Sequence, residues 1–152
     1  MALRYILFAL LLTAVTGIVL WKFGETDVPA FADADNVELV TLGSAVYGEY
    51  CASCHGADLK GQPDWQTRLS DGRMPAPPHD ESGHTWHHPD EQNFKVTKLG
   101  IEALAPPGYK SDMQGFGEIL TDTEIWASLA YIKSRWPEAI RRRHAEMSAR
   151  SR

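Results

Sequence analysis

Cysteine is scarce in this chain, because only Cys51 and Cys54 occur among its 152 residues. One closely spaced pair cannot supply the disulfide framework that stabilises many small secreted proteins. The sequence also has no internal repeat and no convincing alternation of polar and apolar residues, which argues against solenoids and sheet-based folds. Positive charge is in deficit, with a formal net charge of −5, which argues against a nucleic-acid partner.

The composition is typical of one small helical domain with appendages. Twelve glycines and nine prolines indicate long irregular connections between a few helices, and the length is that of a single core. We therefore predict an all-α fold. Changes of composition divide the chain into a membrane anchor or signal peptide at 1–24, a linker at 25–36, the folded domain at 37–137 and a basic tail at 138–152.

An apolar run from Tyr5 to Trp21 predicts one N-terminal transmembrane helix. Its seventeen residues would form a helix about 25 Å long, just enough to cross a bilayer core. Ala30-Phe31-Ala32 offers a small-x-small cleavage site for a signal peptide, but the site lies about ten residues beyond the run, outside the usual compact cleavage region. The pattern therefore favours an uncleaved anchor over a signal peptide.

Three helices are predicted in the folded domain. The first carries residues at helical spacing on one face, so that both thiols lie on the same side; these are Gly43, Val46, Tyr47, Tyr50, Cys51 and Cys54. A second helix begins after Thr121 with a capping box completed by Glu124, and its apolar stripe comprises Ile125, Trp126, Leu129, Ala130, Ile132 and Trp136. A weaker helix covers 90–99. We expect the first and last helices to cross at Gly43 with Tyr47 and Trp126 in contact, although packing without this crossing is equally allowed.

The segment Cys51-Ala52-Ser53-Cys54-His55 is the most informative motif. Two cysteines three positions apart can bond to both vinyl groups of a haem, and the adjacent histidine can ligate the iron. A thioredoxin-like redox pair would need a preceding strand, a zinc site would need a second pair of ligands, and a buried cysteine can be a small apolar residue. Covalent haem is the interpretation that the motif favours most.

With its surroundings, this motif resembles the class I monohaem cytochromes c, in a membrane-anchored bacterial form. The resemblance covers about residues 37–137 and rests on Gly43-Ser-Ala-Val-Tyr47, the cysteine motif with Gly56, Ala57-Asp-Leu-Lys-Gly61 and the helix that follows Leu120. It implies a few helices wrapped around one covalent haem c, with the first and last helices crossing. It also implies haem attachment outside the cytoplasm, which would place the folded domain in the periplasm and the single anchor in the inner membrane.

The resemblance further implies the second iron ligand, a methionine on a loop shortly before the last helix. Met113 lies eight residues before Thr121 and matches this position, although the proline that usually follows is replaced by Gln114. Met74, a histidine and an open site are the alternatives. The family also holds the other ring nitrogen of His55 with a carbonyl from a proline-rich segment. The candidates are Pro75, Pro77 and Pro78.

A histidine-rich stretch follows the prolines and contains His79, His84, His87 and His88. The last three have a spacing that suits copper or zinc. The stretch has no thiol, however, and has Gly and Pro at its edges. The pattern therefore favours a structural or haem-pocket use over a second metal site.

Charge is divided unevenly along the chain. Residues 33–138 hold 8 Lys/Arg against 17 Asp/Glu, a net charge of −9, whereas the residues after Glu138 hold five arginines against one glutamate. Ile140 and Met147 continue only a thin apolar stripe there, which predicts a solvated helical extension. Attraction of the tail to anionic headgroups or to an acidic partner is the alternative.

From these features we expect an electron carrier and not an enzyme. The resemblance implies a haem c held by Cys51 and Cys54, with His55 and Met113 as the axial ligands of the iron. It names a quinol-oxidising complex or dehydrogenase as donor and a terminal oxidase or reductase as acceptor. The alternatives are a haem subunit of a larger respiratory complex, a gas-binding haem protein, and a metal-handling protein that uses the histidine-rich stretch.

Overall fold

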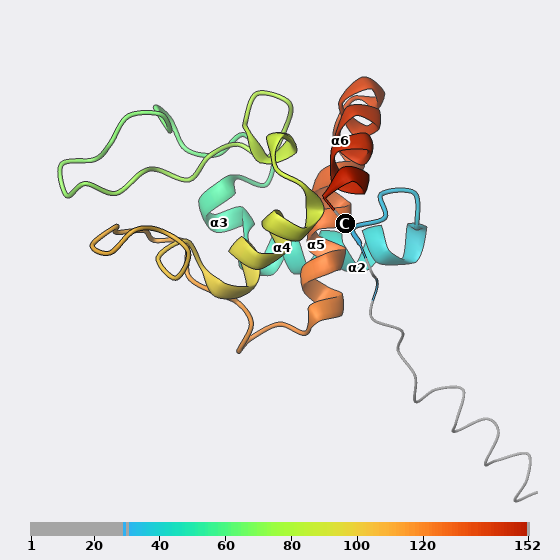
Figure 1. Ribbon diagram of the computed structural model, residues 1–152, viewed down its shortest axis with the longest axis horizontal. Coiled ribbons are helices and arrows are strands. Elements are labelled where there is room, and N and C mark those ends of the chain that lie inside the picture. The colour runs from blue at the N-terminus through green and yellow to red at the C-terminus, as the bar shows by residue number, and fades with distance from the viewer. Residues whose placement is uncertain (1–28, 30, 152) are drawn as a thin grey trace, which may run out of the picture.

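The computed structural model describes residues 29 and 31–151. Its helical segments are α2 (Val37–Tyr50), α3 (Ala52–His55), the 3₁₀ helix η1 (Thr85–His87), α4 (Asp90–Leu99), α5 (Asp122–Ser134) and α6 (Glu138–Arg150). Across this part of the chain there is no strand, only one isolated bridge between Gly100 and Gln114. Figure 1 shows helices gathered on one side and two long loops projecting on the other. The all-α fold is confirmed for the described residues.

The central packing contact is between α2 and α5. A Cβ atom on Gly43 would overlap the backbone carbonyl of Ala127, so only glycine permits this close approach. Both helices begin at capped residues: the Asn36 side chain accepts a hydrogen bond from the N–H of Leu39, and Thr121 forms the predicted capping box with Glu124. The predicted crossing at Gly43 is therefore present.

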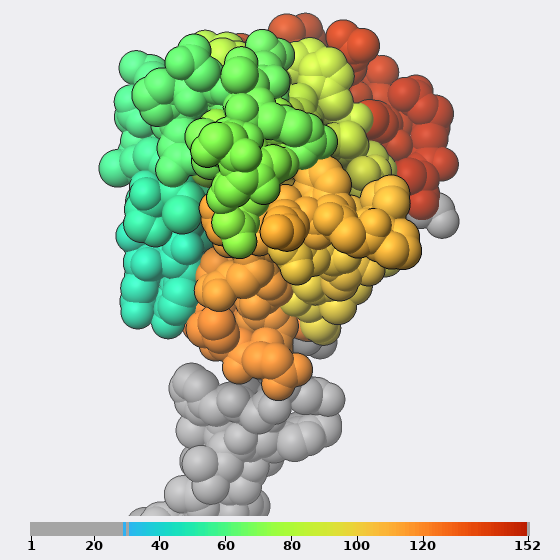
Figure 2. All heavy atoms as spheres, turned by 90° about the vertical axis from the view of Figure 1, so that its left-hand side faces the viewer, coloured from blue at the N-terminus to red at the C-terminus, as the bar shows by residue number. Residues whose placement is uncertain are grey.

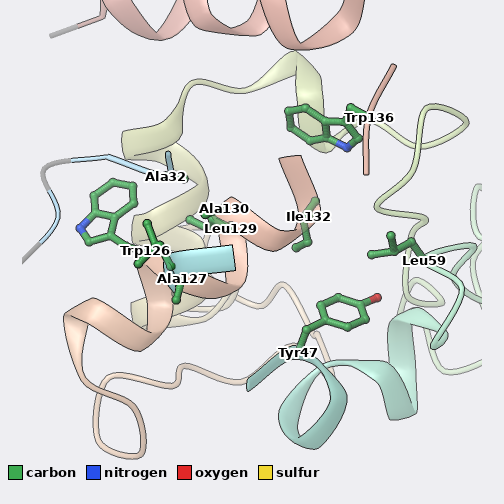
Figure 3. Packing of buried hydrophobic residues seen from close by; sticks show 10 residues of the cluster. Ala32, Tyr47, Leu59, Trp126, Ala127, Leu129, Ala130, Ile132 and Trp136 are labelled. Atoms are coloured by element: carbon green, nitrogen blue, oxygen red, sulfur yellow. The ribbon is translucent and has the colours of Figure 1, made fainter. Parts of the chain in front are cut away.

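The predicted apolar stripe of α5 forms the core. Ile125, Leu129, Ile132 and Trp136 are all buried, as are Trp126 and Ala130. The expected contact between Tyr47 and Trp126 is not the one that forms, and the two rings lie apart (Figure 3). Tyr47 packs on Tyr131 with ring centroids 5.3 Å apart, and Trp126 stacks on Phe94 of α4 at 4.2 Å. The reason is that α4 covers the Trp126 side of α5, which the sequence pattern alone does not specify.

Helix α6 is not the solvated extension that the sequence predicted. His144 is fully buried, Ser148 is 2% exposed, and the Ser148 hydroxyl accepts a hydrogen bond from the backbone N–H of Asp90 at 3.1 Å. Arg141 pairs with Asp35 at 2.9 Å, and Ala32 lies in the core. Polar side chains anchor this helix, so its apolar periodicity is weak. Residues of the predicted linker and of the predicted tail thus both pack against the helical domain.

The predicted transmembrane helix lies outside the described residues. Among residues 29 and 31–151, no helix is long and apolar enough to cross a membrane.

Docking of α6 is expected to weaken in acid because of His144. Its Nε2–H donates to the carbonyl of His88 at 2.9 Å, which leaves Nδ1 buried without a hydrogen-bond partner. Burial and the neighbouring Lys133 ammonium lower the pKa of His144, and Asp90 only partly opposes them. His144 therefore binds a proton less readily in the folded protein than in the unfolded chain. The contribution of neutral His144 to stability is complete above about pH 6.5 and is lost as the pH falls below that value.

Thermal unfolding between pH 7 and pH 5 measures this effect. We expect His144→Gln, which keeps an N–H donor but does not titrate, to lose less stability over this range than the wild type; a difference of about 1 kcal/mol corresponds to roughly 4 °C in Tm. Some acid sensitivity will remain, because burial also lowers the pKa of His55, His79 and His84. Identical pH profiles for the two proteins would show that His144 does not titrate on unfolding.

Candidate haem site

The cysteine motif lies at a break between two helices. Helix α2 ends at Tyr50, and Cys51 adopts φ −115° and ψ −37° before α3 begins at Ala52. The predicted single helix through Cys54 is therefore interrupted, but the break is one residue long. Gly56 ends α3 at φ +80°, a conformation that residues with a Cβ adopt only with strain. The short α3 thus places Cys54 and His55 in one turn.

Neither cysteine is in a disulfide bond; Cys51 is half-buried and Cys54 is exposed. Burial, with a smaller contribution from Cys54, raises the pKa of Cys51 to about 11. A redox-active thiol of the thioredoxin type requires a lowered pKa, and in the described residues no strand precedes the motif. Cys51 is therefore not an activated thiolate, and the motif lacks the preceding strand of a thioredoxin-like pair in the described residues.

One ring nitrogen of His55 is held by the proline-rich segment, as predicted. Nδ1 lies 2.8 Å from the carbonyl oxygen of Pro77 and must donate to it, because a carbonyl only accepts. This selects Pro77 among the three candidates and leaves Nε2 unprotonated. Burial lowers the pKa of His55 despite the opposing effect of this hydrogen bond, which favours the neutral imidazole that binds iron.

Gly61 makes this contact possible. The residue has φ +67°, and a Cβ there would lie 2.6 Å from the backbone of Ala76 and Pro77. The next residue, Gln62, pairs with Ala76 through two hydrogen bonds, one from its backbone N–H and one to its side-chain oxygen. Two segments distant in sequence are thereby fastened together with the Pro77 carbonyl against His55.

His79 lies beside the proximal histidine, a placement that the sequence did not specify. Its ring stacks on His55 with centroids 4.0 Å apart and an interplanar angle of 24°. Its Nδ1 lies 2.8 Å from the Thr85 hydroxyl, and its carbonyl accepts a hydrogen bond from the Trp136 indole at 2.7 Å. In the sequence, only the closeness of His79 to Pro77 pointed to this neighbourhood. That closeness does not say which way the His79 ring faces. The histidine-rich stretch thus contributes one residue that packs directly against His55.

Met113 lies on the loop between α4 and α5. It is half-buried and packs against the cluster of Val46, Phe116, Leu120 and Ile125. Its backbone N–H donates to the Ser111 hydroxyl at 3.1 Å, and its carbonyl accepts from Ile101 at 3.3 Å. Met74 is also half-buried but lies on the loop that follows Gly61. The residues present fit a covalent haem, since two cysteine side chains, one unprotonated imidazole nitrogen and a thioether occur in one small domain.

The remaining histidines do not form a metal site. The rings of His84 and His88 are 5.6 Å apart, but His87 packs on Trp86 at 3.7 Å instead of joining them. Within the part of the chain that the structure describes, no group of three His, Cys, Asp or Glu side chains is placed to hold a metal ion. The metal-handling alternative therefore has no support in the geometry.

Comparison with known proteins agrees with this site. The family model described as "Cytochrome c" matches residues 40–136, well over half of the chain. No curated protein and no solved structure matches. The matched span contains the cysteine motif, the Pro77 carbonyl, and the crossing of α2 with α5. The chain therefore belongs to the cytochrome c family, which implies a covalently bound haem c and haem-based electron transfer.

Proposed function

We propose that this protein is a periplasmic, membrane-tethered carrier of one electron at a time, with a single haem c bonded to Cys51 and Cys54 and with His55 and Met113 as axial ligands. The observation that carries the proposal is the Nδ1–H···O=C contact between His55 and Pro77, which presents the other ring nitrogen to a metal. The haem supplies the reversible one-electron redox change. The protein catalyses no substrate conversion.

The polypeptide supplies attachment, orientation and burial. Helix α3, with Cys51 as its N-cap, fixes the spacing of both thiols to the imidazole. The crossing of α2 with α5 holds α2, which leads directly into this segment. His55 and Met113 would hold the haem iron, and a histidine–methionine ligand pair would raise the potential of the haem and keep rearrangement on electron transfer small. The acidic domain, with a net charge of −9 over 33–138, suits salt-sensitive docking on basic surfaces of partner proteins.

The proposed partners are membrane redox complexes. A quinol-oxidising complex or a dehydrogenase would be the donor, and a terminal oxidase or reductase the acceptor. A tether from the predicted anchor raises the local concentration of the carrier near such complexes. The proposal for the anchor rests on the apolar run of Tyr5 to Trp21.

The experiment that tests this function begins with covalent haem. We expect the full chain, expressed in a host that attaches c-type haem, to stay coloured after acid-acetone washing and to carry the mass of one haem per chain. Cys51→Ala/Cys54→Ala should lose both colour and added mass, because no thioether can form.

Membrane fractionation of the same cells tests the tether, with the protein expected in the membrane pellet. A wild type of bare-chain mass would overturn the proposal.

A further inference from the structure

Two long loops meet at the side of the molecule opposite α6. The 62–78 loop follows Gly61 and the 101–113 loop follows α4; both project in the same direction in Figure 1. Figure 2 shows their green and gold surfaces in contact. Two side-chain contacts cross the junction: Arg73 Nε lies 3.1 Å from Asp112 Oδ1, and the Arg68 guanidinium lies 5.4 Å from the centre of the Tyr109 ring.

Each arginine is positioned by its own loop and extends to the other. Arg73 Nη1 pairs with Asp71 at 2.7 Å, and Arg68 Nη1 donates to the Gly72 carbonyl at 2.7 Å. The Arg73 Nε atom is buried and makes no hydrogen bond, so the Asp112 carboxylate is the charge that compensates it across the junction. These preorganised guanidinium groups lose little additional freedom when they bind the second loop.

The partners of both arginines lie shortly before Met113: Asp112 is the preceding residue, and Tyr109 lies four residues before it. The 101–113 loop is otherwise fastened by its own contacts, such as Ser111 N–H to the Glu102 carboxylate at 2.8 Å and the Gly100–Gln114 bridge. Gln114 supplies none of the rigidity that a proline would give at that position. Contacts from outside the loop can supply that restraint, and the two arginines provide them.

We propose that Arg68 and Arg73, with Tyr109 and Asp112, form a latch that holds Met113 at the iron. The four are positioning residues, and the inference rests on the proposed ligand role of Met113. An exposed ion pair contributes little to overall stability, and Asp112 is 70% exposed. Opening of the 101–113 loop is a local event of low free energy, however. Even the small contribution of one exposed ion pair therefore changes how often the loop opens.

Carbon monoxide binding to the reduced holoprotein measures loop opening, because the probe can bind only when Met113 has left. We expect Asp112→Asn to raise the observed binding rate about two- to five-fold, the range for one exposed ion pair. The conservative variant Asp112→Glu keeps a carboxylate at this position and should bind carbon monoxide at about the wild-type rate. Glu91→Gln is the matched control, since it removes the carboxylate of an exposed ion pair, that with Lys95, which lies within α4 and does not join the two loops. Tyr109→Leu tests the second contact independently and should also raise the rate.

Salt distinguishes the latch from a general loss of structure. Added salt screens the exposed pair, so it should raise the wild-type rate toward that of Asp112→Asn and leave the variant unchanged. The weak long-wavelength absorption of a sulfur–iron bond allows the ligand role of Met113 and the latch to be tested separately. Its absence from the wild type would refute the ligand role of Met113. Its presence, with wild-type carbon monoxide rates in both Asp112→Asn and Tyr109→Leu, would refute the latch.

Discussion

Replacing Met113 with leucine is expected to abolish the weak long-wavelength absorption of the oxidised protein and to lower its midpoint potential. Leucine keeps most of the volume that packs against Val46 and Phe116 but has no sulfur to bind iron. Axial ligands set haem potentials over a range of roughly 0.8 V, and methionine lies toward the high end. Carbon monoxide should also bind the reduced variant without the delay imposed by ligand dissociation.

Met74→Leu is the matched control for this experiment. Met74 is half-buried like Met113 but lies on the facing loop, so its replacement should leave absorption and potential close to those of the wild type. Optical spectra and a redox titration of both variants provide the measurement, and circular dichroism confirms that each is folded. Loss of the absorption band in Met74→Leu instead would transfer the ligand role to Met74.

Removing Lys133 is expected to cause the largest loss of stability, about 3–5 kcal/mol. Its ammonium contacts both carboxylate oxygens of Asp90 at 2.8 and 2.9 Å, and the two side chains are only 11% and 7% exposed. Lys133→Met would leave the Asp90 carboxylate buried without a counter-charge. Since Asp90 also binds Ser148 through its backbone N–H, the variant should loosen α6 as well.

Urea unfolding of the holoprotein measures this loss, and two further variants make it specific. Lys98→Met removes the ion pair of Lys98 with Asp122, which is shorter, at 2.6 Å, but whose side chains are 37% and 41% exposed. Loss of this exposed pair should lower the free energy of unfolding by at most about 1 kcal/mol. Lys133→Met/Asp90→Leu should recover most of the loss, because it removes both buried charges. Equal costs for Lys133→Met and Lys98→Met would show that burial does not govern the strength of the Asp90 pair.

Much of the fold was predictable from local patterns. Pairs such as Thr121 with Glu124 act within one turn, and Gly100 ends α4 at φ +80°, as its place after a helical segment indicates. The placement of His55 beside the two cysteines is likewise local. These features depend on a few neighbouring residues, which is why a sequence pattern can specify them.

The sequence by itself determined the helix that begins after Thr121, the helix that covers 90–99, and a motif suited to covalent haem with its adjacent histidine. It allowed the crossing at Gly43 without requiring it, and the structure decided that this crossing forms. Only the tertiary structure decided which proline carbonyl faces His55, that His79 stacks on that ring, and that Arg73 meets Asp112 across two loops. It also decided that α6 packs on the domain through the buried His144. Such contacts join residues that are distant in the chain, and their partners are selected by the shape and charge of the assembled core, which no local periodicity encodes.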